Sequence, residues 1–285
     1  MPTLDFILPH LLPLMMVITR LAGLFFFAPI LNSSTIPRMV RLMLAVMFGL
    51  AIYPFVPEVD AGVTLNIVQL IPMLFAELII GLAIGLIASL PLLAVQMGGY
   101  IMGYQLGLSL AESFNPVLES NGSVVGDLLF YLAIFAFIGI GGLEIMFSTL
   151  AESFRTVPLG TFSSGDVPLE MFVMVLSSGF ELAIRIATPV MAVVSMLMIS
   201  MGFIMKTMPE VNIMSIGFAA QIVCGLIMLF ACLTIVANVA TEEVYDVLET
   251  IVTWVQSFAD PVLGGSAPPD PMSGMGPGPI GGADG

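Results

Sequence analysis

Five charged residues lie inside long apolar stretches of the sequence, where a charge is costly: Arg20, Glu77, Glu144, Glu181 and Arg185. Charges in such positions often mark the path of an ion or substrate through a membrane, so a solute transporter is one hypothesis. Glu181 and Arg185 are four residues apart and share a helix face, which predicts an intrahelical ion pair. We expect Arg20 and Glu77 to pair between helices. A structural interpretation is therefore favoured for four of the five charges.

Glu144 has no evident basic partner in the sequence. Three glycines precede it within residues 139–142 and indicate a helix end, where the carboxylate would be hydrated. The chain also shows no evident inverted repeat, the usual architecture of secondary transporters. The transporter hypothesis therefore stays open but is not the favoured one.

Residues suited to catalysis are few. The single histidine, His10, has no second histidine or cysteine cluster with which to hold zinc, and the sequence contains no Gly-x-Ser-x-Gly or phosphate-binding loop motif. Gly126-Asp127 and Tyr245-Asp246 are a poor match to the motifs of aspartyl intramembrane proteases, because Val124 occupies a glycine position and the two motifs come in reversed order. We expect no enzymatic activity, no metal and no cofactor.

The composition places these residues in a membrane protein. Hydrophobic residues make up 59% of the chain and charged residues 9%, against about 25% charged residues in ordinary soluble domains. The mean hydropathy is +1.11. The net charge of -14 reflects only six basic residues, and without clustered cations nucleic acid is not an expected partner.

Apolar runs at about 9–31, 39–57, 67–95, 124–147, 169–205 and 212–240 predict six helices, each long enough to cross a bilayer. Backbone groups in lipid must bond within their own segment, so the expected fold is all-α. Pro91 and Pro189 are expected to end, bend or divide the third and fifth runs. Arg38 and Arg41 in the first connection and Lys206 in the fifth predict that these connections are cytoplasmic.

Glycines and glutamines mark faces for close helix contact around the third run. Gly99, Gly103 and Gly107 recur every four residues and form a smooth face that allows another helix to approach. Gly81, Gly85, Gln96 and Gln105 extend the same interpretation. These residues are assigned to helix packing or to a subunit interface.

The segment that follows is neither a clean span nor an ordinary solvated loop. Leu108, Leu110 and Phe114 are large and apolar, and Asn115-Pro116 is a turn signal that ends any helix. Large apolar residues between glycine-rich hinges and turns are typical of a mobile stopper. The alternative is a re-entrant loop that only packs between neighbouring helices.

The C-terminal part changes character. Apolar residues recur at helical spacing from Thr241 to Phe258 opposite an acidic face, which predicts an amphipathic helix that can continue the sixth run. We favour packing of this helix on the same protein over binding of a separate partner. The chain therefore divides into a helical domain, 1–258, and a Gly/Pro-rich tail, 259–285, which we expect to be disordered.

Between the last two apolar runs lies a polar joint, Lys206 to Phe218, that holds the only lysine of the chain. Pro209 lacks an amide proton and disfavours a helical residue before it, so the fifth helix must stop or bend here and the next must restart beyond Asn212. We expect Lys206, Pro209 and Asn212 to position two helices and to contact a partner.

The joint resembles that of the FliR/SctT family of type III protein export gates, whose last two hydrophobic segments meet at a basic, Pro-x-x-Asn-Ile, Gly-Phe sequence. A second resemblance lies near the start, in Arg20-Leu-Ala-Gly23, Pro29, Pro37 and Arg41. Together the resemblance covers roughly residues 10–258. It implies a pore-forming subunit, built of helical hairpins, of a hetero-oligomeric export gate in the bacterial inner membrane at the flagellar basal body.

The same resemblance implies partners and a site. The partners would be FliP-like and FliQ-like subunits, a FlhB-like protein on the cytoplasmic side, membrane lipid, and unfolded flagellar proteins as exported substrates. The loop with Leu108, Leu110, Phe114, Asn115 and Pro116 would contribute a plug to the pore. The homologous subunit of a virulence secretion system is the nearer alternative, and a solute transporter the farther one.

Overall fold

The computed structural model of this protein describes residues 4–31, 36–56, 67–108, 123–160, 169–207 and 213–258. Every regular element within these ranges is a helix, which confirms the prediction of an all-α membrane-type protein. The elements are α1 (Leu4–Phe27), α2 (Arg38–Ile52), the 3-10 turn η1 (Tyr53–Phe55), α3 (Ile67–Gln105), α5 (Val124–Gly139), α6 (Gly142–Thr156), α7 (Leu169–Thr207) and α8 (Ile213–Ser257). The expected disordered tail, 259–285, lies outside the described residues.

Within the described ranges, five helices are long and apolar enough to cross a membrane, and α5 with α6 makes a sixth if that bent pair is one span. The six apolar runs of the sequence therefore each have a helical counterpart. α1 packs on α2, and α7 packs on α8. These two pairs of consecutive helices form helical hairpins.

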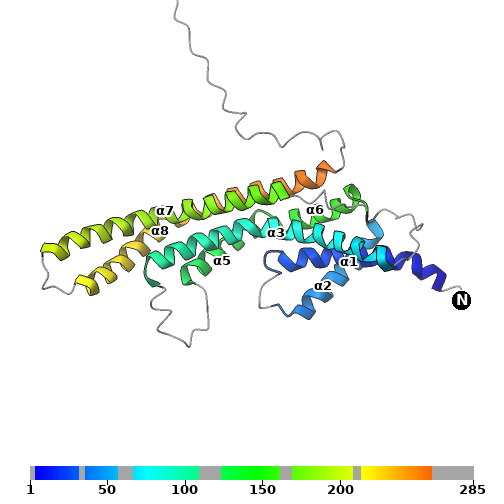
Figure 1. Ribbon diagram of the computed structural model, residues 1–285, viewed down its shortest axis with the longest axis horizontal. Helices are drawn as coiled ribbons and strands as arrows, with labels where there is room; N and C mark the ends of the chain where they lie inside the picture. The colour runs from blue at the N-terminus through cyan, green and yellow to red at the C-terminus, as the bar shows by residue number, and fades with distance from the viewer. Residues whose placement is uncertain are drawn as a thin grey trace, which may run out of the picture.

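Helix α3 is the centre of the molecule. It runs along the long axis and packs against α1, α5, α7 and α8 (Figure 1). Apolar residues surround it on nearly all sides, as expected for a helix that is covered by neighbours rather than by water. Buried Ile80, Ile84, Leu92 and Met102 show that the core follows its length.

The hairpin of α7 and α8 extends beyond the rest of the fold. Its far end, shown in yellow-green and yellow, reaches past α3 and α5 (Figure 1). No residue of α7 after Val194 is buried, and Met196, Ile199 and Phe203 on this end are each more than 60% exposed. We call residues 195–207 and 216–220 the projecting end.

Two expected helix breaks do not occur. Pro91 lies inside α3 and Pro189 inside α7, and each of these helices runs unbroken for 39 residues. Proline is tolerated in a long apolar helix where neighbouring helices and small local adjustments satisfy the freed carbonyl. The third helix also ends ten residues later than the apolar run that predicted it, because the glycine-rich stretch after residue 95 is helical up to Gln105.

A break occurs instead where the sequence predicted a continuous run. The 124–147 run divides into α5 and α6, which meet at an angle of 61°. Gly141 at the junction has a φ of 74°, a left-handed conformation that glycine adopts without strain. Glu144 lies exposed in the first turn of α6, which confirms the predicted hydrated helix end and suits the positive end of the helix dipole.

The amphipathic C-terminal segment is continuous with α8, as expected. Its apolar side is buried, with Val244, Val247, Leu248, Ile251 and Val255 each at most 4% exposed. Helix α8 packs against α6 and α5 as well as α3 and α7. The favoured interpretation, a helix packed on its own protein, is therefore confirmed.

Candidate functional site

Arg20 and Glu77 form a buried ion pair between α1 and α3. Arg20 Nε donates to Glu77 Oε2 at 2.6 Å, and both side chains are completely inaccessible to solvent. This confirms the predicted pairing. Removing two charges from water is costly, and their attraction offsets that cost only if the remaining donors and acceptors are also bonded.

The remaining polar atoms of the pair are bonded by α6 and the turn that follows it. Arg20 Nη1 donates to the carbonyl of Ser153 at 2.9 Å and to its hydroxyl at 3.1 Å, and Nη2 donates to the carbonyl of Val157 at 3.3 Å. The other oxygen of Glu77 accepts the backbone N–H of Gly160 at 2.8 Å. The guanidinium also lies 4.5 Å from the ring centre of Phe154.

We call Arg20, Glu77, Ser153, Val157 and Gly160 the Arg20–Glu77 network. It links α1, α3 and α6, and both carboxylate oxygens of Glu77 accept hydrogen bonds. An acid bonded in this way is not poised to take up an ion or a proton from a passing solute, which weakens the transporter hypothesis. Sequence reasoning missed Ser153, Val157 and Gly160, because backbone acceptors and donors carry no signal in residue type and one serine hydroxyl does not indicate which residue it contacts.

The glycines at 81 and 85 pack against α1 within the same chain. A Cβ atom at Gly81 would overlap the carbonyl oxygen of Arg20, and one at Gly85 would lie 2.6 Å from the carbonyl oxygen of Leu24. Gly23 on α1 meets α3 in the same way, 2.5 Å from the carbonyl oxygen of Leu78. The backbone contact between α1 and α3 brings Arg20 and Glu77 within bonding distance.

The second group of glycines lines contacts with α5 and α8. A Cβ at Gly99 would lie 2.6 Å from Cα of Gly126, and one at Gly103 would overlap the hydroxyl of Ser123. Gly107, with a φ of 77°, closes the end of α3 beside the ring of Phe218. Of the two assignments the sequence left open, these contacts support helix packing within the chain.

The two glutamines also find partners within the chain. Gln96 Nε2 donates to Asp127 Oδ1 at 3.2 Å, across the contact between α3 and α5. Gln105 Nε2 approaches Ser195 Oγ at 3.5 Å, while its backbone carbonyl accepts Gln221 Nε2 at 2.5 Å. The end of α3 is thus held to α7 and α8 by amide contacts.

The predicted ion pair of Glu181 and Arg185 is not formed. Both residues lie exposed on α7, and the ion pairs between described residues are Arg20–Glu77 and Arg155–Glu152. An exposed i, i+4 pair gains only about 0.3–0.5 kcal/mol, too little to hold two long side chains together. The two charges instead face outward from an apolar helix.

The joint and the plug are only partly described. Lys206 lies exposed in the last turn of α7, at the tip of the projecting end, while Pro209 and Asn212 lie outside the described residues. Of the plug residues, Leu110, Phe114, Asn115 and Pro116 also lie outside them. Leu108 is described, and it is half-buried against the core.

Comparison with known proteins identifies relatives over most of this chain. The family model described as "Bacterial export proteins, family 1" matches residues 11–247. The chain is similar to the flagellar biosynthetic protein FliR of Aquifex aeolicus, at 26% identity over 88% of this chain and 96% of the relative. It is also similar to FliR of Escherichia coli, at 26% identity over 82% of this chain and 90% of the relative, and to FliR of Bacillus subtilis, at 24% identity over 83% and 92%.

Proposed function

Since this chain belongs to the bacterial export proteins, family 1, we propose that it is a structural, pore-forming subunit of the flagellar type III export gate. Membership of the flagellar export apparatus as a membrane protein follows from the family and from the FliR relatives. The proposal adds its partners, its place in the basal body of the inner membrane, and its plug. The relatives reported above carry flagellar names, which favours the flagellar over the virulence alternative.

The observation that carries this proposal is the match of one export-protein family along residues 11–247. The projecting end of the α7–α8 hairpin supports assembly with other subunits. Ile199 is 63% exposed and Phe203 is 71% exposed, while Glu181 and Arg185 lie on the outer surface of the same helix. Pure lipid would cover the apolar residues but not the charges, whereas neighbouring subunits cover both.

We assign this surface to FliP-like and FliQ-like subunits, with Lys206 near a FlhB-like partner on the cytoplasmic side. The exported substrates are unfolded flagellar proteins. The test is isolation of the assembly: a tagged chain expressed with those subunits from the same organism should co-purify with them, and its loss should abolish motility and export of hook protein. Normal motility without this chain contradicts the proposal. Rescue of a virulence system but not of motility selects the alternative.

The plug assignment applies to the segment between α3 and α5. Leu108 lies against the core, so the proposed tip is carried by Leu110 and Phe114, next to Asn115-Pro116. Large apolar side chains block ions by filling and dewetting a narrow passage, so closure depends on size more than on charge. Phe114→Ala or deletion of 110–118 should raise the membrane conductance of cells expressing the assembly, and Glu112→Gln should not.

Leu108→Ala is the matched control, because this side chain packs on the core next to the proposed tip. It should lower the stability of the chain without opening a leak. If the deletion leaks no more than the wild type while the assembly is shown to be intact, the segment is a packing loop and the plug assignment fails.

A further inference from the structure

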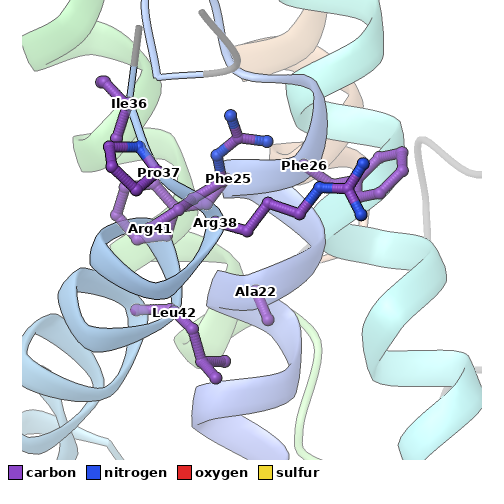
Figure 2. Close-up of a pocket in the computed structure, with 9 residues that line it drawn as sticks. Ala22, Phe25, Phe26, Ile36, Pro37, Arg38, Arg41 and Leu42 are labelled. Carbon is purple, nitrogen blue, oxygen red and sulfur yellow. The ribbon is translucent and has the colours of Figure 1, made fainter. Parts of the chain in front are cut away.

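An open cavity of about 830 Å³ lies between the end of α1 and the start of α2. Its lining is mostly apolar and includes Ala22, Phe25 and Phe26 from α1 and Leu42 from α2. Arg38 and Arg41 extend from the first turn of α2 towards the α1 side (Figure 2). The described lining therefore combines two cations with an apolar surface and contains no acidic residue.

The two arginines lie at the edge of the apolar part of the molecule. The stretch of α1 that is apolar enough to span a membrane ends at Phe27, and the corresponding stretch of α2 begins at Arg38. The cavity therefore lies where both candidate spans end. Because basic residues in a short connection favour the cytoplasmic side, this edge is expected to face the leaflet that carries anionic lipids.

The start of α2 adds to the positive potential of the cavity. Pro37 precedes the helix and makes no side-chain capping bond, and the first turn carries no acidic residue. The positive end of the helix dipole therefore points the same way as the two guanidinium groups. Guanidinium groups bind phosphate through paired hydrogen bonds, so the site is complementary to a phosphate group.

Helix α2 also offers an exposed apolar surface below the arginines. Within the described residues it packs against α1 and η1, while Met39, Met43 and Met47 are each more than 60% exposed. Leu42 in the cavity wall is 54% exposed, so the apolar lining continues outward along the helix. A molecule bound by its phosphate at the arginines would have an apolar path for a hydrocarbon chain in the direction of the membrane.

We propose that this cavity binds an anionic phospholipid, with its phosphate held by Arg38 and Arg41 and an acyl chain along Phe26 and Leu42. The volume lies within the range of about 300–1,000 Å³ typical of small-molecule sites, enough for a headgroup and the first part of a chain. A carboxylate from another protein would meet the charges but not the open apolar path. The site requires a membrane location but does not depend on the export function.

The experiment is lipid binding by the full chain, purified from membranes in a neutral detergent with the subunits that accompany it. Phosphatidylglycerol and phosphatidylcholine are added separately, and bound lipid is counted by native mass spectrometry. The wild type should bind phosphatidylglycerol in preference to phosphatidylcholine. The double variant Arg38→Gln/Arg41→Gln should bind phosphatidylglycerol about 30-fold more weakly, since each basic residue near a membrane surface contributes about fivefold.

Arg155→Gln is the matched control, because it removes an exposed cation of α6 that does not line the cavity. It should bind phosphatidylglycerol like the wild type. Leu42→Trp keeps both arginines, fills the cavity from an exposed position, and should also weaken binding; it keeps the proposal testable if the double variant fails to fold. Equal binding of phosphatidylcholine, or crosslinking of residue 42 to a protein subunit in place of lipid, would each overturn the proposal.

Discussion

At the scale of single residues, the Arg20–Glu77 network shows how a buried charge is stabilised. The pair itself was predictable, because Arg20 and Glu77 are opposite charges that both lie inside apolar runs, the first and the third, where each charge needs a partner. Their further contacts were not predictable. Ser153 and the Val157 carbonyl reach Arg20 only because the chain turns between α5 and α6 at Gly141, within what the sequence predicted as one run.

Replacing one member of the pair should destabilise the chain strongly. Glu77→Gln leaves the buried guanidinium without its counter-charge, and loss of one partner of a buried ion pair costs about 3–5 kcal/mol. Thermal denaturation of the purified protein in detergent measures this loss. Glu152→Gln is the control, because Glu152 pairs with Arg155 at 3.8 Å on the surface and should cost under about 1 kcal/mol.

A double variant separates the charge effect from the packing effect. Arg20→Met/Glu77→Leu removes both charges but leaves the Gly160 N–H without its acceptor, a penalty of about 1–3 kcal/mol. It should therefore be more stable than Glu77→Gln and less stable than the wild type. Equal stability of Glu77→Gln and Glu152→Gln would show that the pair does not hold the helices together.

Lys206 should matter through its charge. It lies exposed at the tip of the projecting end. A reversed charge at an interface weakens binding of the partner, whereas the chain can adjust to loss of the bend that Pro209 is expected to impose. Lys206→Glu should lower the yield of the assembly and export more than Pro209→Ala, as measured by co-purification and by secreted hook protein. Unchanged yield and unchanged export in Lys206→Glu would remove the role assigned to this residue.

At the scale of elements, small residues determine how closely the helices pack. Gly81 should be intolerant of any side chain, because a Cβ there overlaps the backbone of α1 and backbone cannot move aside as a flexible side chain can. Gly81→Ala should therefore lower the melting temperature. Gly202→Ala is the matched control: nothing lies within 4 Å of a Cβ at Gly202, and alanine favours a helix over glycine by about 1 kcal/mol. A Gly81→Ala chain as stable as Gly202→Ala would refute the close contact.

The number of elements was easier to predict than their boundaries. Apolar length alone predicts the six apolar stretches that the described helices occupy, with α5 and α6 sharing one stretch, and burial of the amphipathic end of α8 followed from its helical period. The divisions expected at Pro91 and Pro189 are absent, since both prolines are accommodated within long helices. Gly141 is the opposite case, because one continuous run was predicted there and the chain breaks into α5 and α6. A φ of 74° at this junction favours glycine, but the run of apolar residues on both sides gives no sign of the bend.

At the scale of the whole molecule, the described chain is a core around α3 with many exposed apolar side chains, including those of α2 and the projecting end. The sequence left the glycine faces open to helix packing or to a subunit interface, and the described contacts of these glycines lie within the chain. Dependence on partner subunits is therefore predicted from exposed apolar residues such as Met39, Met47 and Phe203.

The isolated chain should therefore aggregate or be degraded, and FliP-like and FliQ-like subunits should restore its yield. Size-exclusion chromatography of the chain expressed alone and with those subunits tests this directly. Phe203→Asn on the projecting end should reduce recovery of the assembly without changing the folding of the core, because this side chain is 71% exposed. A stable, monodisperse monomer from the chain alone would count heavily against the proposed assembly.

The Arg20–Glu77 network also has a consequence for biogenesis. Arg20 precedes Glu77 by 57 residues and Ser153 by 133, so a chain made from its N-terminus delivers the arginine to the membrane before any of these partners is synthesised. An arginine at the centre of a helix opposes insertion by about 2.5–3.5 kcal/mol. The first hairpin is therefore inserted against a penalty that α3 is the first element to reduce. Nascent chains that stop before Ile67 should remain on the insertion machinery or be destroyed, and chains that continue past Gln105 should be released into the bilayer.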